Sequence, residues 1–349
     1  MQNKINYLNQ KDEYIFVDFV KFICALLVVT IHIPMFTDIN KDFCYFETQI
    51  LARLAVPFFF LCSGFFIGNK LKDKTKFIFY CKRLLILYVI YTILYIPLII
   101  AKWNMSDNNL LQILKKLFLV GSFNQLWYFL AIIVASLILH FLVVKVKLSD
   151  IKLLVISSIL YILGVLLCSY GDLLYELPII KYVVYVYLCV FSTARNGIFF
   201  GLFFVVIGYL INKHGDIIKN RLKLYSILSI LFFGLMSLES YLLLEYLNKN
   251  SLDMTFTASF ATVFLFLFVI FVKIPKQHFK YGIILRKLSI LIFGFHKMID
   301  FYIEKFIKKH LDFNSLEYGI MIIIITIAFS SCILLLEKNS KFKFLRYLH

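Results

Sequence analysis

The sequence predicts an all-α membrane protein, a polytopic transmembrane helical bundle of about ten spans with both termini in the cytoplasm. Of the 349 residues, 62% are hydrophobic and 16% are charged, whereas soluble domains are typically about 45–50% apolar and about 25% charged. Apolar runs of roughly 20 residues, long enough to cross a bilayer as helices, recur along the whole chain. The alternating segments of about 10 residues that a transmembrane β-barrel needs are absent.

The apolar runs follow one another with short connections, so we predict one integral membrane domain over residues 1–349. The predicted spans lie near 14–36, 46–68, 84–101, 124–144, 151–170, 197–212, 222–247, 255–272, 284–303 and 317–336. Segment 174–192 is apolar but short, with Pro178 and Lys181 near its start. We predict that it is a re-entrant or interfacial helix. GFFIG (64–68) and GIFFG (197–201) are G-x-x-x-G patterns, which let helices approach closely.

The distribution of Lys and Arg decides the predicted topology. With ten spans, the two termini and the loops on their side carry 24 of the 37 basic residues, and the opposite loops carry 10. Positive loops face the cytoplasm, so both termini are expected there. An eleventh span at 174–192 would reverse every later loop. The net charge of +17 therefore reflects orientation, and we expect no nucleic-acid partner.

Ionisable residues interrupt several predicted spans. A charge near the middle of a membrane costs about 2.5–3.5 kcal/mol on insertion scales, so such residues usually face a protein interior or a wet cavity. The candidates are Asp18, Lys21, His32, Arg53, Glu239, His296, Lys297 and Asp300, with Arg195 at the mouth of the sixth span. No group of His, Cys and Asp residues has the spacing of metal ligands, so no metal is expected.

The first span carries a polar stripe. Lys21 and His32 are eleven residues apart, which on an α-helix is about 20° beyond three full turns, so both face one way about 16 Å apart. Asp18 joins that face. The stripe fits an extended ligand, anionic at its cytoplasmic end and reactive at its deeper end. Alternatively, Asp18 and Lys21 pair near the interface and His32 bonds between helices. Pro34 is expected to kink the helix near His32.

The other buried charges fit either a ligand site or the fold. Arg53 would contact a phosphate or carboxylate, or it would pair with Glu239 or Asp300. A lone acid such as Glu239 needs a cationic partner or a proton. His296 and Asp300 are four residues apart on one helix face. The acid is therefore a candidate to orient the imidazole, either as a catalytic pair or as a structural hydrogen bond.

Several stretches together resemble one family over most of the chain. Lys21-x10-His32 is similar to the R-x10-H signature in the first helix of the acyltransferase-3 family of integral membrane acyltransferases. RLAVPFFFLCSGFFIG (53–68), CKRLLILY (81–88), LWYFLAIIVA (126–135) and FGFHKMID (293–300) resemble later helices of that family. VKFICALLVV (20–29), RLAVPFFF and ARNGIFFGLFF most resemble the membrane domain of the vancomycin-resistance membrane-bound serine racemases. Lysine replaces the usual arginine at residue 21, and it meets a phosphate only as a point charge.

The resemblance implies a membrane-bound O-acyltransferase in the cell membrane. Its expected donor is cytoplasmic acyl-CoA, typically acetyl-CoA, and its expected acceptor is an extracytoplasmic hydroxyl such as that of a cell-envelope glycan. It implies His32 as the catalytic base, Lys21, Arg53 and Arg195 at the donor, and Asp18, Glu239, His296 and Asp300 as candidates for support.

The resemblance to the membrane domain of the serine racemases, a branch of the family, leaves an alternative open. That branch's membrane domain is associated with serine uptake, so a carrier for a small amino acid such as serine is the competing interpretation. Because the chain ends about 13 residues after its last predicted span, we expect no racemase or esterase domain and no pyridoxal phosphate.

Overall fold

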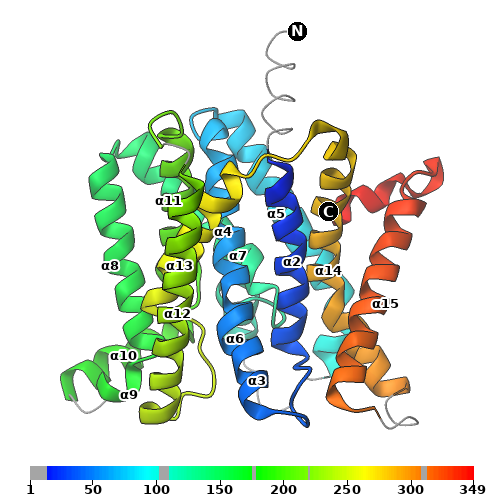
Figure 1. The fold of residues 1–349 in the computed structure, drawn as a ribbon, viewed down its shortest axis with the longest axis horizontal. Coiled ribbons are helices and arrows are strands. Elements are labelled where there is room, and N and C mark those ends of the chain that lie inside the picture. The colour runs from blue at the N-terminus through cyan, green and yellow to red at the C-terminus, as the bar shows by residue number, and fades with distance from the viewer. Residues whose placement is uncertain (1–13, 102–109, 175–177, 219–220, 308–312) are drawn as a thin grey trace. The chain divides into compact units, whose positions relative to one another are not determined.

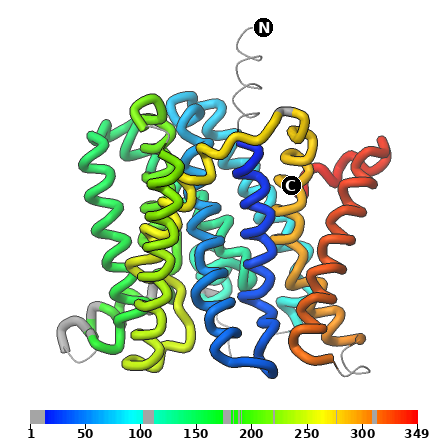
Figure 2. Tube along the Cα trace, in the orientation of Figure 1, coloured from blue at the N-terminus to red at the C-terminus, as the bar shows by residue number. Residues whose placement is uncertain are grey.

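A computed structural model describes residues 14–101, 110–174, 178–218, 221–307 and 313–349 (Figures 1 and 2). Every regular element in those ranges is helical, which confirms the all-α class. The helices that correspond to predicted spans are α2 (Ile15–His32), α4 (Ala55–Ile67), α5 (Lys74–Ala101), α7 (Trp127–His140), α8 (Asp150–Cys168), α11 (Leu202–Lys213), α12 (Leu222–Leu247), α13 (Phe256–Phe271), α14 (Phe279–Phe306) and α15 (Ser315–Leu336).

Shorter helical pieces extend or connect these helices. The short α-helices are α3 (Lys41–Tyr45), α6 (Leu110–Lys115), α9 (Gly171–Leu174) and α10 (Pro178–Phe191). The π-helical and 3-10 turns are η1 (Phe46–Leu51), η2 (Ala52–Leu54), η3 (Gly68–Lys70), η5 (Lys116–Val120), η6 (Phe141–Lys145), η7 (Gly197–Gly201), η8 (Lys276–His278) and η9 (Ser340–Leu348). The predicted second span is therefore a run of α, π and 3-10 turns rather than one regular helix.

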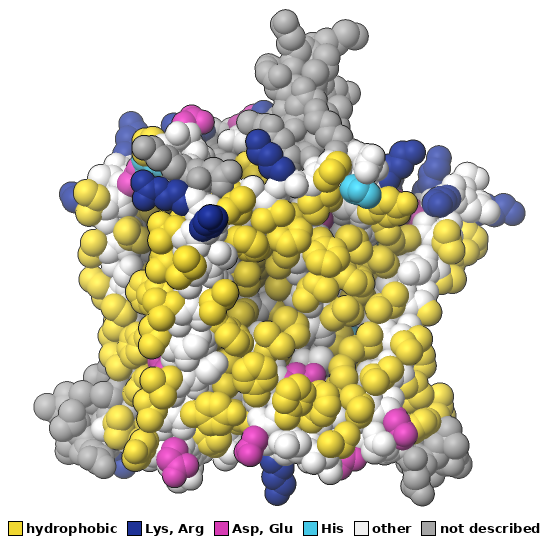
Figure 3. Space-filling model, in the orientation of Figure 1, with side chains coloured by type: hydrophobic (Ala, Val, Ile, Leu, Met, Phe, Trp, Pro, Cys, Tyr) yellow, Lys and Arg dark blue, Asp and Glu magenta, His cyan; other side chains and the backbone are white. Residues whose placement is uncertain are grey.

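The surfaces of the helices are those of a membrane protein. Among the described residues, seven helices are long and apolar enough to cross a membrane, and two more apolar helices are shorter. Large apolar side chains point outward from them, with Phe79 71%, Ile151 77% and Ile230 73% exposed. Figure 3 shows hydrophobic side chains covering the sides of the helices, with Lys and Arg near helix ends. Soluble proteins rarely expose such faces. The chain is a multi-pass integral membrane protein, and the count of ten spans stays a prediction.

The described residues form two compact units. The first unit holds the described parts of 1–59, 220–234 and 260–349. In it, α14 packs along α2, and α15 lies beside α14 (Figure 1). Three contacts keep the same order along α2 and α14: Ile15 with Gly282, Asp18 with Arg286, and His32 with His296. The two helices are therefore parallel, which is the direction that a ten-span topology requires of its first and ninth spans.

The second unit holds the described parts of 60–219 and 235–259. Its helices approach at glycines. A Cβ placed on Gly64 would lie 2.2 Å from the carbonyl oxygen of Val205, and one on Gly208 would lie 2.2 Å from that of Leu61. Any side chain at these glycines would push α4 and α11 apart, so the close approach predicted from the GFFIG pattern is confirmed.

The first helix ends earlier than predicted. The predicted span reaches residue 36, but α2 stops at His32, and Ile33 leaves the helical conformation with φ −138° and ψ 77°. Pro34 has no N–H, and its ring disfavours a helical conformation at the residue before it. The helix therefore ends instead of kinking, and His32 is its last residue.

The uncertain segment 174–192 contains the 14-residue helix α10, from Pro178 to Phe191. Residues 175–177 lie outside the described ranges. The re-entrant or interfacial position of segment 174–192 stays a prediction.

Candidate functional site

The predicted stripe lies on one unbroken helix. Because α2 is a regular α-helix from Ile15 to His32, the spacing argument applies, and Lys21 and His32 share a face about 16 Å apart. Lys21 has a side chain that is 16% exposed, and His32 is half-buried. Both residues are in the first unit, where α14 covers α2.

The N-terminal end of the stripe is a charge cluster centred on Asp18, which is 3% exposed. Arg286 of α14 donates to both carboxylate oxygens, from Nε at 2.8 and 3.0 Å and from Nη2 at 2.5 Å. Lys21 Nζ lies farther away, 3.9 Å from Oδ1 of Asp18. A two-pronged guanidinium contact is stronger and more directional than a contact with an ammonium. Asp18 is therefore held mainly by Arg286.

The deep end of the stripe is a pair of imidazoles. The rings of His32 and His296 stack with centroids 5.4 Å apart and an angle of 26° between their planes. His296 is fully buried, and its Nδ1 lies 3.0 Å from the carbonyl oxygen of Ile292. A carbonyl only accepts, so Nδ1 carries the hydrogen. In the neutral ring, Nε2 is then a proton acceptor, and it has no hydrogen-bond partner among the described residues.

Asp300 has partners other than His296. Lys297 Nζ lies 2.6 Å from Oδ2 of Asp300, and the Tyr318 hydroxyl donates to Oδ1 at 2.9 Å. The predicted contact between Asp300 and His296 is thus replaced by bonds to Lys297 and to Tyr318 of α15. Asp300 is a buried structural carboxylate that ties α14 to α15.

Arg53 turns toward its own helix. Its Nε donates to the Thr48 carbonyl at 3.1 Å, and its Nη2 donates to Gln49 Oε1 at 2.6 Å. Thr48 and Gln49 belong to the π-helical turn before Arg53, whose wider winding brings them under the guanidinium. Neither Glu239 nor Asp300 is among these partners.

Glu239 caps a helix in the second unit. Its carboxylate accepts from the backbone N–H groups of Phe256 and Thr257 at 2.9 and 2.8 Å, and from the Tyr170 hydroxyl at 2.9 Å. The Thr257 hydroxyl also donates to it. An acid at a helix N-terminus satisfies N–H groups that have no helical partner. The expected cationic partner of Glu239 is thus replaced by the start of α13, and its role is structural.

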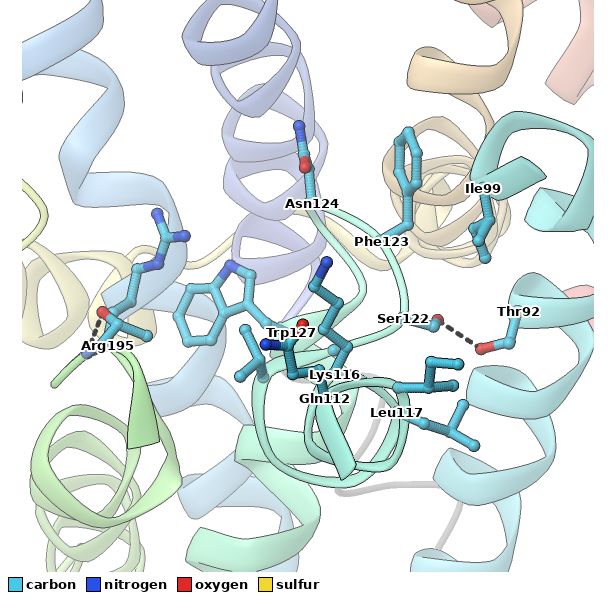
Figure 4. A pocket seen from close by; sticks show the side chains of 14 residues that line it. Thr92, Ile99, Gln112, Lys116, Leu117, Ser122, Phe123, Asn124, Trp127 and Arg195 are labelled. Carbon is cyan, nitrogen blue, oxygen red and sulfur yellow. Dashed lines mark hydrogen bonds between the residues drawn. The ribbon is translucent and has the colours of Figure 1, made fainter. Parts of the chain in front are cut away.

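Arg195 lines a cavity in the second unit (Figure 4). Its guanidinium lies over the ring of Trp127, 4.9 Å from the centroid, and its Nη1 donates to Asp253 at 2.8 Å. Lys21, Arg53 and His32 do not line this cavity. Among the described residues, no three His, Cys, Asp or Glu side chains are grouped to hold a metal ion.

Sequence reasoning missed three residues of these sites. Arg286 lies at the start of the predicted span 284–303 but is not among the predicted site residues, although a buried acid such as Asp18 signals that a cation must reach it. Trp127 and Lys116 line the cavity with Arg195. The sequence held a signal for each of them: Trp127 is an aromatic residue at the start of a helix, and Lys116 is a lysine within an apolar segment.

In a helical membrane protein, buried charge pairs and a buried imidazole stacked on a second one mark candidate functional sites. The chain is a member of the acyltransferase-3 family, because residues 14–335 match that family's profile, which is described as an acyltransferase domain. This confirms the resemblance found in the motifs.

Relatives of the chain are racemases by name. It is 31% identical to an amino-acid racemase of Enterococcus faecalis over 240 residues, covering 67% of this chain and 33% of the relative. A serine/alanine racemase of Enterococcus gallinarum is 28% identical over 57% of this chain and 29% of its own length. Another Enterococcus faecalis amino-acid racemase is 25% identical over 93% of this chain and 46% of its own length. The chain thus spans less than half of each relative. No solved structure matches it.

Proposed function

We propose that the chain is a membrane-bound O-acyltransferase that moves an acyl group, most simply acetyl, from cytoplasmic acyl-CoA to an extracytoplasmic hydroxyl such as that of a cell-envelope glycan. The observation that carries the proposal is the stacked pair of His32 and His296 in a chain of the acyltransferase-3 family. A neutral imidazole nitrogen can accept a proton from a hydroxyl and return it, which is the role of a general base and acid.

In the proposed reaction, His32 accepts the proton of the acceptor hydroxyl while the hydroxyl oxygen attacks the thioester carbonyl carbon. The C–S bond then breaks, the acyl group remains on the acceptor oxygen, and the coenzyme A thiolate takes up the proton. His296 supplies a second, buried proton acceptor at Nε2. A bound hydroxyl or water would donate a hydrogen bond to this nitrogen. The Nδ1 bond of His296 to the Ile292 carbonyl fixes the tautomer that this role needs.

The donor would lie along α2 with its phosphates at the cytoplasmic end. Lys21 and Arg286 provide two cations there, and Asp18 offsets one of them. The rise of about 16 Å from Lys21 to His32 is the length over which the pantetheine arm would extend. Arg53 and Arg195 remain candidates for donor contacts only through the family resemblance.

A second candidate is a carrier for a small amino acid such as serine. The names of the relatives favour it, because they are an amino-acid racemase and a serine/alanine racemase. In that case, the buried charges would form the binding site of the carrier, as they do in many transporters.

One experiment separates the two candidates. The purified full chain is reconstituted in liposomes, and hydrolysis of labelled acetyl-CoA is measured for the wild type and for His32→Ala. We expect turnover in the wild type and its loss in the variant. Labelled serine accumulating inside the liposomes, with no acetyl-CoA turnover, would establish the carrier and reject acyl transfer.

A further inference from the structure

The cavity of the second unit has the size of a small-ligand site. Its volume is about 420 Å³, within the usual range of about 300–1,000 Å³ for ligand pockets. Its walls come from α5, α6, the turn η5, the segment leading into α7, and Thr193 and Arg195 before η7 (Figure 4). Under the predicted topology, segments 102–123 and 171–196 face away from the cytoplasm, so the cavity would open on the extracytoplasmic side.

Three polar side chains of this cavity are hydrogen-bond donors only. Arg195 and Lys116 are cations without acceptor atoms, and the Trp127 indole N–H only donates. Asn124 and Gln112 add amide groups that both donate and accept. No lining residue among those described is an Asp or Glu. A wall of this kind favours a ligand that offers acceptor oxygens and negative charge.

Part of the Arg195 guanidinium is left unused by the protein. Nη1 is paired with Asp253, but Nε is buried and has no hydrogen-bond partner among the described residues. An unsatisfied buried donor costs about 1–3 kcal/mol, and more when it is charged. The guanidinium of Arg195 is therefore only partly paired within the described residues.

Two cations line the cavity, Arg195 and Lys116. Arg195 is already paired with Asp253, at 2.8 Å. A carboxylate carries one negative charge, whereas a phosphate monoester carries about 1.5 to 2 near neutral pH. A carboxylate therefore places the smaller charge on a wall whose arginine is already paired.

The position of Trp127 is fixed by the chain before it. Gly121 has φ +107°, and a Cβ there would lie 2.6 Å from the backbone nitrogen of Trp127. Only glycine accepts that conformation without strain. On one face of the indole lies Arg195, and the ring gives the cavity an apolar wall beside its donors. Such a wall suits the carbon skeleton of a sugar or an amino acid.

We propose that this cavity binds a ligand of about the size of a monosaccharide through a carboxylate held by Arg195 and Lys116. On the proposed acyltransferase function, on which this part rests, the ligand is the acceptor. The same chemistry would hold a free amino acid.

The test is direct binding by the full chain in nanodiscs, measured by isothermal titration calorimetry with two matched pairs of probes. Glucuronate is compared with glucose, which has a hydroxymethyl group in place of the carboxylate, and L-serine is compared with ethanolamine, which lacks it. We expect the carboxylate of at least one pair to bind about tenfold or more tightly, as a charged hydrogen bond implies. Preference within the first pair identifies a sugar acid, and preference within the second identifies an amino acid.

Three variants assign the preference to this cavity. Lys116→Gln and Arg195→Gln should abolish it, and Lys116→Gln keeps the test valid if loss of the Asp253 pair impairs folding of the arginine variant. Lys181→Gln removes the same charge from an exposed position on α10 outside the cavity and should leave the preference intact. No preference in either pair, or a preference that survives Lys116→Gln, would overturn the proposal.

Acetyl-CoA hydrolysis on the same preparations, with and without His32→Ala, tests the acyltransferase function without using the carboxylate preference. Either result can therefore fail while the other stands.

Discussion

The two ends of the contact between α2 and α14 treat their ionisable groups in opposite ways. At the N-terminal end of α2, Asp18 is matched by the guanidinium of Arg286, and each carboxylate oxygen has a donor. At the other end, His32 and His296 stack, and Nε2 of His296 has no donor or acceptor among the described residues. The same two helices thus hold a fully paired carboxylate and an imidazole nitrogen that the described residues leave unpaired.

This difference separates groups that hold the fold from groups that remain available for chemistry. A buried charge whose partners are all in place contributes mainly to assembly, and removing one partner is costly. A buried base without a partner lowers stability, so its presence needs another explanation. The comparison predicts large stability effects at one end and large activity effects at the other.

The largest expected effect is on activity at the deep end. His32→Ala should lower acyl transfer by about 10²–10⁴-fold, the usual contribution of a general base, while the unfolding midpoint changes little because the ring is only half-buried. Labelled acetyl-CoA turnover and thermal unfolding in detergent measure the two quantities. His278→Ala is the control, since His278 is exposed at the start of α14, and equal losses in the two variants would contradict the assignment.

The next effect is on stability at the N-terminal end of α2. Asp18→Ala leaves Arg286 without its carboxylate, and breaking a buried ion pair in this way costs about 3–5 kcal/mol. We expect a clearly lower unfolding midpoint. Asp172→Ala is the matched control, because Asp172 is an exposed carboxylate that pairs with Lys249 and such pairs contribute little. Similar midpoints for both variants would show that Asp18 is not a structural charge.

A third variant tests the unsatisfied imidazole itself. His296→Phe keeps an aromatic ring but removes Nε2, so stability should be unchanged or should rise, because no buried acceptor remains unpaired. Acyl transfer should fall by about tenfold or more if Nε2 accepts a proton or a hydrogen bond during the reaction. A lower unfolding midpoint with full activity would instead identify His296 as a packing residue.

The smallest effect is a pH dependence outside the membrane spans, at Glu337. Partial burial raises the pKa of this carboxyl, but hydrogen bonds from Lys287 and His349 more than offset that, and its pKa lies below the ordinary value of about 4.3. A lowered pKa stabilises the folded state above the unfolded value, and this contribution is lost as the pH falls through the folded value.

Unfolding midpoints at pH 7 and near pH 3.5 measure this contribution. The wild type should lose more stability on acidification than Glu337→Gln, which has no carboxylate to protonate. Equal losses would mean that the contacts of Glu337 with Lys287 and His349 do not contribute in solution.

The sequence predicted which residues form helices better than it predicted which helices pack against each other. Apolar runs and basic loops were enough for the spans, and regular winding was enough to place Lys21 and His32 on one face of α2. Spacing on one helix does not say which other helix lies opposite, so the pairing of Asp18 with Arg286, 268 positions away, could not be predicted. For the same reason, Asp300 was expected to meet His296 and instead meets Tyr318 of another helix.

Local irregularity limited the prediction at Arg53. The second span changes between α, π and 3-10 winding before that residue, so the constant angle of 100° per residue does not apply there. A π-helical turn has no clear signature in the sequence, and it brings Thr48 and Gln49 under the guanidinium.

The long separation between Asp18 and Arg286 has a consequence for biosynthesis. At about 5–20 residues per second, the ribosome needs on the order of tens of seconds after making α2 before it makes α14. During that interval, the nascent first helix has no guanidinium from α14 for its carboxylate. The imidazole pair is also incomplete until then, so a chain interrupted before α14 cannot carry out premature chemistry with it.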